Sequence, residues 1–484
     1  MQKLQMYLKE ATAAFLVSVL LFSCGQRQPE NKIPANALVK VGSRYMMPED
    51  FTHRLRFTPH QPLKGMTLPK KRELYLKPLI DEALFANAAN SLNLDTNRVY
   101  RLKLREIEKD YVREQLYNKE IGDSAHITQN QLRTALFRSQ HQLTLDYLPF
   151  ETKEEAQYAE DLINSGEATF DEVVSILDTV SAKAPHIDVR WGQLIPSIED
   201  TVYNLKQGET TGIIETPSGY LIMRLDTTKQ VIPSAAKSPE ELVGKVRQVM
   251  KDRQLDAASS EYIQNIMRNI DVKVNQDGVE VLEQYVKAHQ PMPPSDSLQQ
   301  TTSDDKEIRQ LFGYSSQQLD KPLVNFGDHE WTIREFLEIV YARGVSLPDK
   351  TKPVPPWIKN TLGEMMRDEV LADEGFQQHL DTTATVRHQV NRWDNFYSSQ
   401  LYADYLHQNF SNDSVYVAVV SRKLDSLSTL YPPQIDYKTL HQLPVDNTEM
   451  IAVKRGNPTR LAVPPYPNSF LQLELSKKDS LSTH

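Results

Sequence analysis

The sequence is poor in cysteine and glycine, and it lacks the usual signatures of metal and nucleotide sites. The chain has 484 residues, with one Cys and 17 Gly against 28 Pro. A single Cys excludes a disulfide framework, and the low glycine content argues against a flexible low-complexity chain. The patterns HExxH, GxSxG, GxxxxGK[ST] and GxGxxG are missing, and the twelve His include no pair at metal-ligand spacing. We therefore predict no metal site, no cofactor and no nucleotide.

The chain carries a mild acidic excess. The formal net charge is −9, and no basic stripe with interleaved aromatic residues occurs, so we predict no nucleic-acid partner. Hydrophobic residues make up 39% and charged residues 25% of the chain, which fits a well-folded protein. The length predicts about two to four domains.

The one cysteine stands at the end of a predicted export signal. Lys3 and Lys9 precede an apolar run over residues 11–22, which is too short to span a bilayer as a stable helix. The ending at Cys24 resembles a bacterial lipobox, which implies cleavage before Cys24 and lipidation of its thiol. An ordinary signal peptide or signal anchor with an incidental Cys is the alternative. We predict a lipoprotein of the bacterial cell envelope that faces the periplasm. Gly25 favours the outer membrane, because some bacteria retain lipoproteins at the inner membrane with Asp there.

The stretch from Arg190 to Asp226 carries the most specific pattern in the chain. Four apolar residues form one face of a predicted helix, namely Ile195, Ile198, Val202 and Leu205. Gly208 follows where a helix end favours positive φ. A Pro-Ser-Gly turn at 217–219 then precedes a predicted strand from Tyr220 to Leu225. Upstream, a strand is predicted over 143–150 and helices over 154–165 and 170–177.

This order resembles a parvulin peptidyl-prolyl isomerase domain. The family has a Leu-Lys-x-Gly-Glu turn and a Ser-Gly-Tyr-His strand, which appear here as Leu205–Glu209 and Ser218–Leu221. The resemblance implies a four-stranded antiparallel sheet with helices. The flanking segments resemble the helical chaperone segments of SurA- and PrsA-like foldases. On the N-terminal side, a predicted strand is followed by a turn at Gly42 and a helix that begins at Pro48. On the C-terminal side, a long helix capped by Ser238 is predicted.

An internal repeat follows a linker rich in Pro, Ser, Thr and Gln. Residues 42–51 (GSRYMMPEDF) match residues 327–336 (GDHEWTIREF) with the same Gly-to-Phe spacing. Two further pairs, Asp81/Asp368 and Leu94/Leu380, keep offsets of 287 and 286. We predict a second copy of the helical module, the alternative being chance similarity between amphipathic helices. In the first copy, Asp95 or Thr96 is predicted to cap the helix that follows.

The predicted fold class is α+β, with mostly helical chaperone-type modules that flank one parvulin-like domain. The long helix after that domain is expected to return to the first module. The predicted organisation is a signal peptide (1–23), a tether (24–36), an N-terminal helical module (37–140), a parvulin-like domain (141–230), a returning helix and strand (238–290), a linker (291–320), a second helical module (321–410) and a C-terminal extension (411–484).

The resemblance also implies where isomerase chemistry would lie. Rotation about the prolyl amide has a barrier of about 18–20 kcal/mol, which an enzyme lowers by binding the twisted amide better than the planar one. Parvulins place two His, a Cys or Asp, and a Ser or Thr over that amide. The corresponding positions here are Tyr147, Leu221, Val180 and Ser218. Both His and the Cys or Asp are therefore replaced, and no catalytic residue is assigned. His186 is placed in a surface loop.

The same comparison implies an apolar peptide cleft. Its predicted lining residues are Trp191, Leu194, Ile198 and Leu221. The alternative for Ile198 and Leu221 is that they pack the core of the domain. We expect a foldase or holdase that binds unfolded or Pro-containing polypeptides and has weak or absent isomerase activity. An active isomerase and a structural accessory lipoprotein of an envelope assembly machine are the alternatives.

Overall fold

The computed structural model describes residues 34–177, 184–216, 219–231, 238–290, 317–410, 413–445, 453–454, 457–461 and 463–482. The predictions for Cys24, Val180 and Ser218 lie outside these residues, as do those for the export signal, most of the tether and most of the linker. The chain divides into two compact units. The first comprises the residues up to Val112 and those from Asp271 on, and the second runs from Arg113 to Ile270. Among the described residues, no helix is long and apolar enough to cross a membrane.

The second unit is built on a four-stranded antiparallel sheet, as predicted, with the strand order β4-β3-β6-β5. The strands are β3 (His141–Phe150), β4 (His186–Arg190), β5 (Ile214–Thr216) and β6 (Gly219–Gln230). In the central pair, Tyr147 lies opposite Met223 and Pro149 lies opposite Leu221. Because side chains alternate along a strand, this register places Tyr147 and Leu221 on the same face of the sheet.

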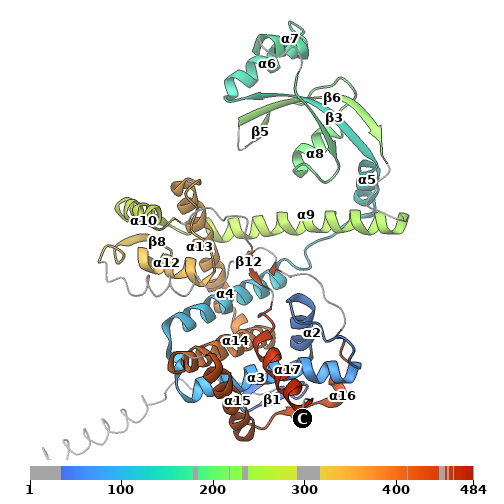
Figure 1. Cartoon of the computed structure of the whole chain (residues 1–484). Helices are drawn as coiled ribbons and strands as arrows, with labels where there is room; N and C mark the ends of the chain where they lie inside the picture. Colours follow the sequence, from blue (N-terminus) through green and yellow to red (C-terminus); the bar gives the residue numbers. More distant parts are fainter. Residues whose placement is uncertain are drawn as a thin grey trace, which may run out of the picture. The chain divides into compact units, whose positions relative to one another are not determined.

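Helices cover both faces of this sheet (Figure 1). The predicted helices are α6 (Lys153–Ser165) and α7 (Phe170–Leu177), and they pack on one face around Leu148 and Ile222. α6 begins at a Thr152 capping box and ends at Gly166, whose φ is +75°. The other face carries α8 (Pro196–Val202), which packs against Leu143, Leu145, Met223 and Leu225. The α+β class is therefore confirmed.

Strand β4 corrects the prediction of a loop around His186. His186 is the first residue of β4 and pairs with Asp146 of β3, although it is exposed as expected. The strand lies at the edge of the sheet, and only Val189 of its five residues is buried. Ile187 and Val189 do alternate with polar residues, but the strand has only five residues and so gives a weak periodic signal.

Two further helices complete the second unit. They are α5 (Gln129–Ser139), which begins at the predicted Thr128 capping box, and α9 (Pro239–Met267), which is capped by Ser238. Leu132 and Ala135 of α5 pack with Val246 of α9 in a small apolar cluster. The long helix therefore has a packing partner within the second unit.

The first unit contains two copies of one element order. The first copy is β1 (Val39–Val41), β2 (Arg44–Met46), α2 (Pro48–Phe57), α3 (Leu68–Ser91), η1 (Leu94–Thr96) and α4 (Arg98–Glu120), whose last turns belong to the second unit. The second copy is β8 (Pro322–Phe326), β9 (His329–Thr332), α12 (Ile333–Ala342), α13 (Val354–Gln377), η2 (Leu380–Thr382) and α14 (Ala384–Asn409). Helices α3 and α13 have the same length of 24 residues.

Backbone geometry repeats along with the element order. The hairpin glycines Gly42 and Gly327 have φ of +57° and +52°, and the residues before the two short 3-10 turns, Asn93 and His379, have φ of +55° and +57°. The predicted caps at Asp95 and Thr96 are wrong, because both residues lie within η1. Instead, the side chain of Asn97 accepts a hydrogen bond from the backbone N–H of Tyr100 at 3.1 Å.

Each hairpin gains a third strand from outside its own copy. The hairpin β1-β2 is joined by β10 (Gln434–Ile435), which follows the second copy, and the hairpin β8-β9 is joined by β7 (Val272–Val274), which precedes the second copy. The helices of the two copies contact each other directly. Helix α14 packs along α3, while Lys109 of α4 forms an ion pair with Glu369 of α13 at 2.8 Å. The two copies therefore form one interlocked core.

The C-terminal residues belong to this core as well. Val419, Val420 and Leu424 of α15 (Asp413–Leu430) pack into the apolar cluster around α3, and so does Phe470 of α17 (Asn468–Ser482). The hydroxyl of Tyr466 donates a hydrogen bond to the carbonyl of Tyr75 at 2.8 Å. The remaining elements are α10 (Gln276–His289), α16 (Tyr437–Leu440), β11 (Val453–Lys454) and β12 (Asn457–Leu461).

Candidate peptide-binding cleft

An apolar surface lies on the α8 side of the four-stranded sheet. Tyr147 of β3 and Ile214 of β5 are half-buried there and pack with Leu194 and Ile198 from the α8 segment. Leu221, also half-buried, pairs with Ile214 across β5 and β6 and so lies on the same face. The structure therefore brings together Leu194, Ile198 and Leu221, three of the four predicted lining residues.

Two exposed isoleucines extend this surface. Ile195 is 59% exposed at the start of α8, directly after Leu194. Ile187 of β4 is 44% exposed and pairs with Leu145, whose side chain faces α8. Sequence reasoning missed Ile187 because it did not identify β4. Together with the half-buried residues, these side chains offer a peptide an accessible apolar face.

A buried ion pair fixes the loop that carries Leu194. Glu199 of α8 is 1% exposed, and Arg253 of α9 donates hydrogen bonds to its two carboxylate oxygens at 2.6 and 3.1 Å. The same guanidinium donates to the carbonyl of Leu194 at 3.0 Å. Glu199 also accepts the backbone N–H of Gly192 at 2.6 Å. Arg253 thus positions one side of the apolar surface, although it lies 59 residues from Leu194 in the sequence, a link that no local motif reveals.

Trp191 lies apart from the other predicted lining residues. It packs against α5 and α9, with the guanidinium of Arg253 at 5.2 Å from its ring centre. It also borders a hollow of about 430 Å³ lined by residues such as Thr134, Pro196 and Met250. Its contacts anchor the loop before α8, and the described structure does not place it beside Leu221.

The end of α8 is held to the sheet by Tyr203. Its hydroxyl donates a hydrogen bond to the carbonyl of His141 at 2.9 Å. Burial, aided by the negative charge of Glu199, raises the pKa of Tyr203 to about 12. The phenol therefore stays protonated at neutral pH and remains a donor.

The opposite face of the sheet carries a charged cluster with a different role. Arg224 of β6 bonds Asp146 of β3 at 2.7 Å and Asp171 of α7 at 2.9 Å, and it lies over the ring of Phe170. Hydrogen bonding from Arg224 lowers the pKa of the Asp171 carboxyl. These contacts connect α7 to the sheet and lie on the face away from the cleft.

The chemistry available in the cleft is mainly apolar contact. Of the four positions where the resemblance implies polar catalytic groups, Tyr147 and Leu221 are described, and they supply one phenol and one aliphatic side chain. Leu194, Ile198 and Ile214 can grip a prolyl ring or another apolar side chain. Selective stabilisation of a twisted amide would have to come from groups other than a His pair.

A comparison with protein-family models finds a match in the same part of the chain. Residues 131–241 match the model of the PPIC-type PPIase domain. The chain carries a parvulin-type domain. The matched residues extend from α5 through the whole sheet to the start of α9, so α5 belongs with this parvulin-type domain.

Solved structures give weaker similarities. The peptidylprolyl isomerase PrsA from Bacillus anthracis is 12% identical with a TM-score of 0.20, and the match covers 44% of this chain and 94% of that one. A chain from Campylobacter jejuni, where PEB4 and Cj1289 are described as SurA-like chaperones, is 16% identical with a TM-score of 0.21, covering 44% and 90%. PrsA from Bacillus subtilis is 19% identical with a TM-score of 0.16, covering 42% and 85%. A search among curated proteins gives no match.

Proposed function

We propose that the protein is a lipid-anchored foldase or holdase of the SurA/PrsA class that binds unfolded exported or outer-membrane proteins and has weak or absent isomerase activity. The observation that carries the proposal is an accessible apolar surface in the PPIC-type domain that includes Tyr147 and Leu221, the residues at the two positions where the parvulin resemblance implies histidines. Such a surface can bind a peptide through apolar contacts. Most of the polar groups that would act on the prolyl amide are replaced.

The anchoring part of this proposal rests on the sequence. The lipobox-like ending at Cys24 supports lipidation and a periplasm-facing position, with the outer membrane favoured by Gly25. Radiolabelled palmitate incorporated into the wild-type chain in cells, and not into Cys24→Ser, is the expected result. Equal labelling of both chains would contradict it.

Client binding is tested by aggregation of several unrelated unfolded proteins. The protein should suppress aggregation at near-stoichiometric ratios, and Ile195→Asp should weaken suppression because it places a charge on the exposed rim of the cleft. Ile176→Asp is a matched control, since Ile176 is also 59% exposed but lies on α7. Equal loss in both variants would show that general surface hydrophobicity is responsible.

An active isomerase is the second candidate, favoured by the PPIC-type match over residues 131–241. A protease-coupled assay on a Pro-containing peptide separates the two functions. We expect turnover far below that of a parvulin with both His, and a gain in the double variant Tyr147→His, Leu221→His. Parvulin-level turnover by the wild-type chain would establish the isomerase instead.

A further inference from the structure

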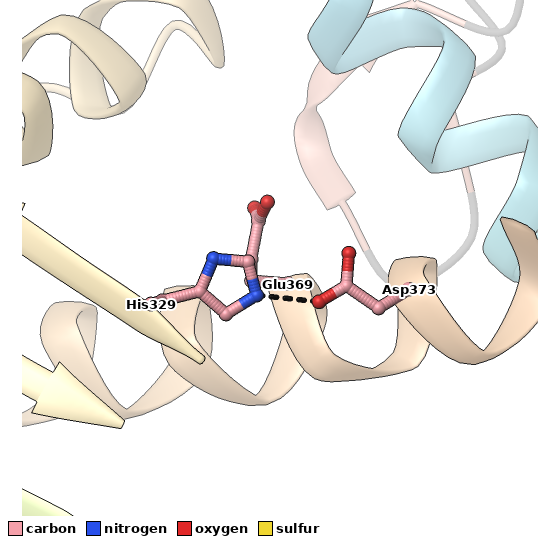
Figure 2. A group of neighbouring side chains, drawn as sticks. All are labelled: His329, Glu369 and Asp373. Atoms are coloured by element: carbon pink, nitrogen blue, oxygen red, sulfur yellow. Dashed lines mark hydrogen bonds and ion pairs between the residues drawn. The ribbon is translucent and has the colours of Figure 1, made fainter. Parts of the chain in front are cut away.

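Three potential metal ligands meet in the first unit, in the second copy of the helical module. His329 of β9 and Glu369 and Asp373 of α13 have donor atoms that all lie within 4.8 Å of one another (Figure 2). Glu369 and Asp373 are four residues apart, which places them on one face of the helix. His329 approaches them from the hairpin, and its Nε2 lies 2.5 Å from a carboxylate oxygen of Asp373. No local sequence motif marks this group, because His329 lies 44 residues from Asp373 and 40 residues from Glu369.

The environment of the cluster already orients its donors. The imidazole of His329 stacks on Phe326, with ring centres 4.9 Å apart and planes at 23°. Glu369 is buried, and one of its oxygens is bound by Lys109 at 2.8 Å. Lys109 also bonds Glu106, which has a second cationic partner in Arg343. The charge of Lys109 is therefore shared between two carboxylates.

Two carboxylates and one imidazole supply the donors of the cluster. Among the described contacts, Glu369 pairs with Lys109 and Asp373 with His329. Imidazole binds a metal through its neutral form.

The first copy shows that the module does not need these residues for its architecture. The bounds of α3 and α13 and the pair Asn93/His379 give an offset of 286, so that the sequence pair Asp81/Asp368 is one residue out of the structural register. In this register Ala83 and Asn87 are equivalent to Glu369 and Asp373, and the hairpin offset of 285 makes Arg44 equivalent to His329. There the guanidinium of Arg44 pairs with Asp394, and the amide of Asn87 donates to the carbonyls of Val41 and Ala83 at 2.8 Å. The first copy thus has a fixed cation and an amide where the second has an imidazole and two carboxylates.

We propose that His329, Glu369 and Asp373 form a binding site for a divalent transition-metal ion of the Zn²⁺ type, which clips the β8-β9 hairpin to α13. One imidazole nitrogen and two carboxylate oxygens are a donor set that Zn²⁺ accepts, with water in the fourth position. Tetrahedral Zn²⁺ places its ligands about 3.3 Å apart. Binding therefore requires His329 and Asp373, which are 2.5 Å apart, to separate slightly. Both His329 and Asp373 are partly exposed, which leaves room for that adjustment.

The alternative to a metal site is an ordinary His–Asp ion pair beside a Lys–Glu ion pair. Metal titration distinguishes these two explanations. Chelator-treated full-length protein is titrated with Zn²⁺ alone by calorimetry, and its Tm is measured with and without Zn²⁺. We expect one Zn²⁺ per chain and a higher Tm, with binding weakened at least about tenfold in His329→Gln and in Asp373→Asn. Co²⁺ in place of Zn²⁺ should give the visible absorption of a low-coordinate site, which His329→Gln abolishes.

His388→Gln is the matched control. His388 lies 3.1 Å from Asp50 and 3.9 Å from Glu49, so it also neighbours two carboxylates in the first unit, without belonging to the converging group. This variant should keep the wild-type Zn²⁺ affinity. Absence of one-to-one binding by the wild-type protein, or equal affinity in the His329→Gln variant, would overturn the site. Because the readout is metal binding, the result is independent of client binding and isomerase activity.

Discussion

The ion pair between Arg253 and Glu199 offers the sharpest test of how the cleft is built. In Arg253→Gln the carboxylate of Glu199, which is 1% exposed, loses the partner that neutralises it. The carbonyl of Leu194 loses its donor in the same change. The variant should therefore destabilise the second unit and also release the loop that carries Leu194 from its contact with α9.

The size of the effect follows from the burial of the two partners. Removing one member of a fully buried ion pair costs about 3–5 kcal/mol. The side chain of Arg253 is 23% exposed, so water can partly solvate the orphaned charge, and we expect about 2–3 kcal/mol. The second unit spans 158 residues, from 113 to 270, so this loss corresponds to a Tm decrease of roughly 5–10 °C.

Calorimetric unfolding measures this effect, and a second Arg–acid pair on α8 supplies the control. Arg138 pairs with Asp200, which is 67% exposed, so Arg138→Gln should cost under about 1 kcal/mol. The double variant Arg253→Gln, Glu199→Gln should recover part of the loss, because it removes the buried charge. Equal destabilisation by the two Arg variants, or no recovery in the double variant, would refute the reasoning.

Two further predictions concern other parts of the molecule. Gly42→Ala should destabilise the first unit by about 2–4 kcal/mol in urea unfolding, because its φ is +57° and a Cβ would lie 2.8 Å from an oxygen of Asn87. Gly65→Ala, with φ of +72° and open space around the Cβ, should cost only about 1 kcal/mol, and equal losses would contradict the clash. Arg224 lowers the pKa of Asp171, so their interaction stabilises the fold above the ordinary Asp pKa and is lost as pH falls through the lowered value. The Tm difference between wild type and Arg224→Gln should therefore narrow in acid; a constant difference would contradict the assignment.

Local features of the fold could be predicted from the sequence because short-range chemistry sets them. Helix α7 begins and ends at the predicted residues, Phe170 and Leu177, and the caps at Thr128 and Ser238 bind the expected backbone N–H groups. Strand β6 includes the predicted strand from Tyr220 to Leu225. In each case the decisive interaction spans only a few residues.

Features that depend on distant contacts could not be predicted. Edge strand β4 is defined by its pairing with β3, since its own residues are mostly exposed. The role of Arg253 depends on Glu199, 54 residues earlier, and the strand that completes the first hairpin comes from Gln434 and Ile435. Leu194, Ile198 and Leu221, which are predicted to share one surface, lie on the same side of the sheet, whereas Trp191 joins the α5-α9 cluster because Arg253 and α9 supply its packing partners.

The central claim is that the parvulin-type domain holds peptides better than it isomerises them. The most direct measurement is an aggregation-suppression assay and a Pro-peptide isomerase assay on one sample of the wild-type protein. The proposal predicts suppression for several unrelated clients together with turnover far below that of a parvulin with both His. Parvulin-level turnover without suppression would contradict it, and stoichiometric capture of a single partner with neither activity would identify an accessory subunit instead.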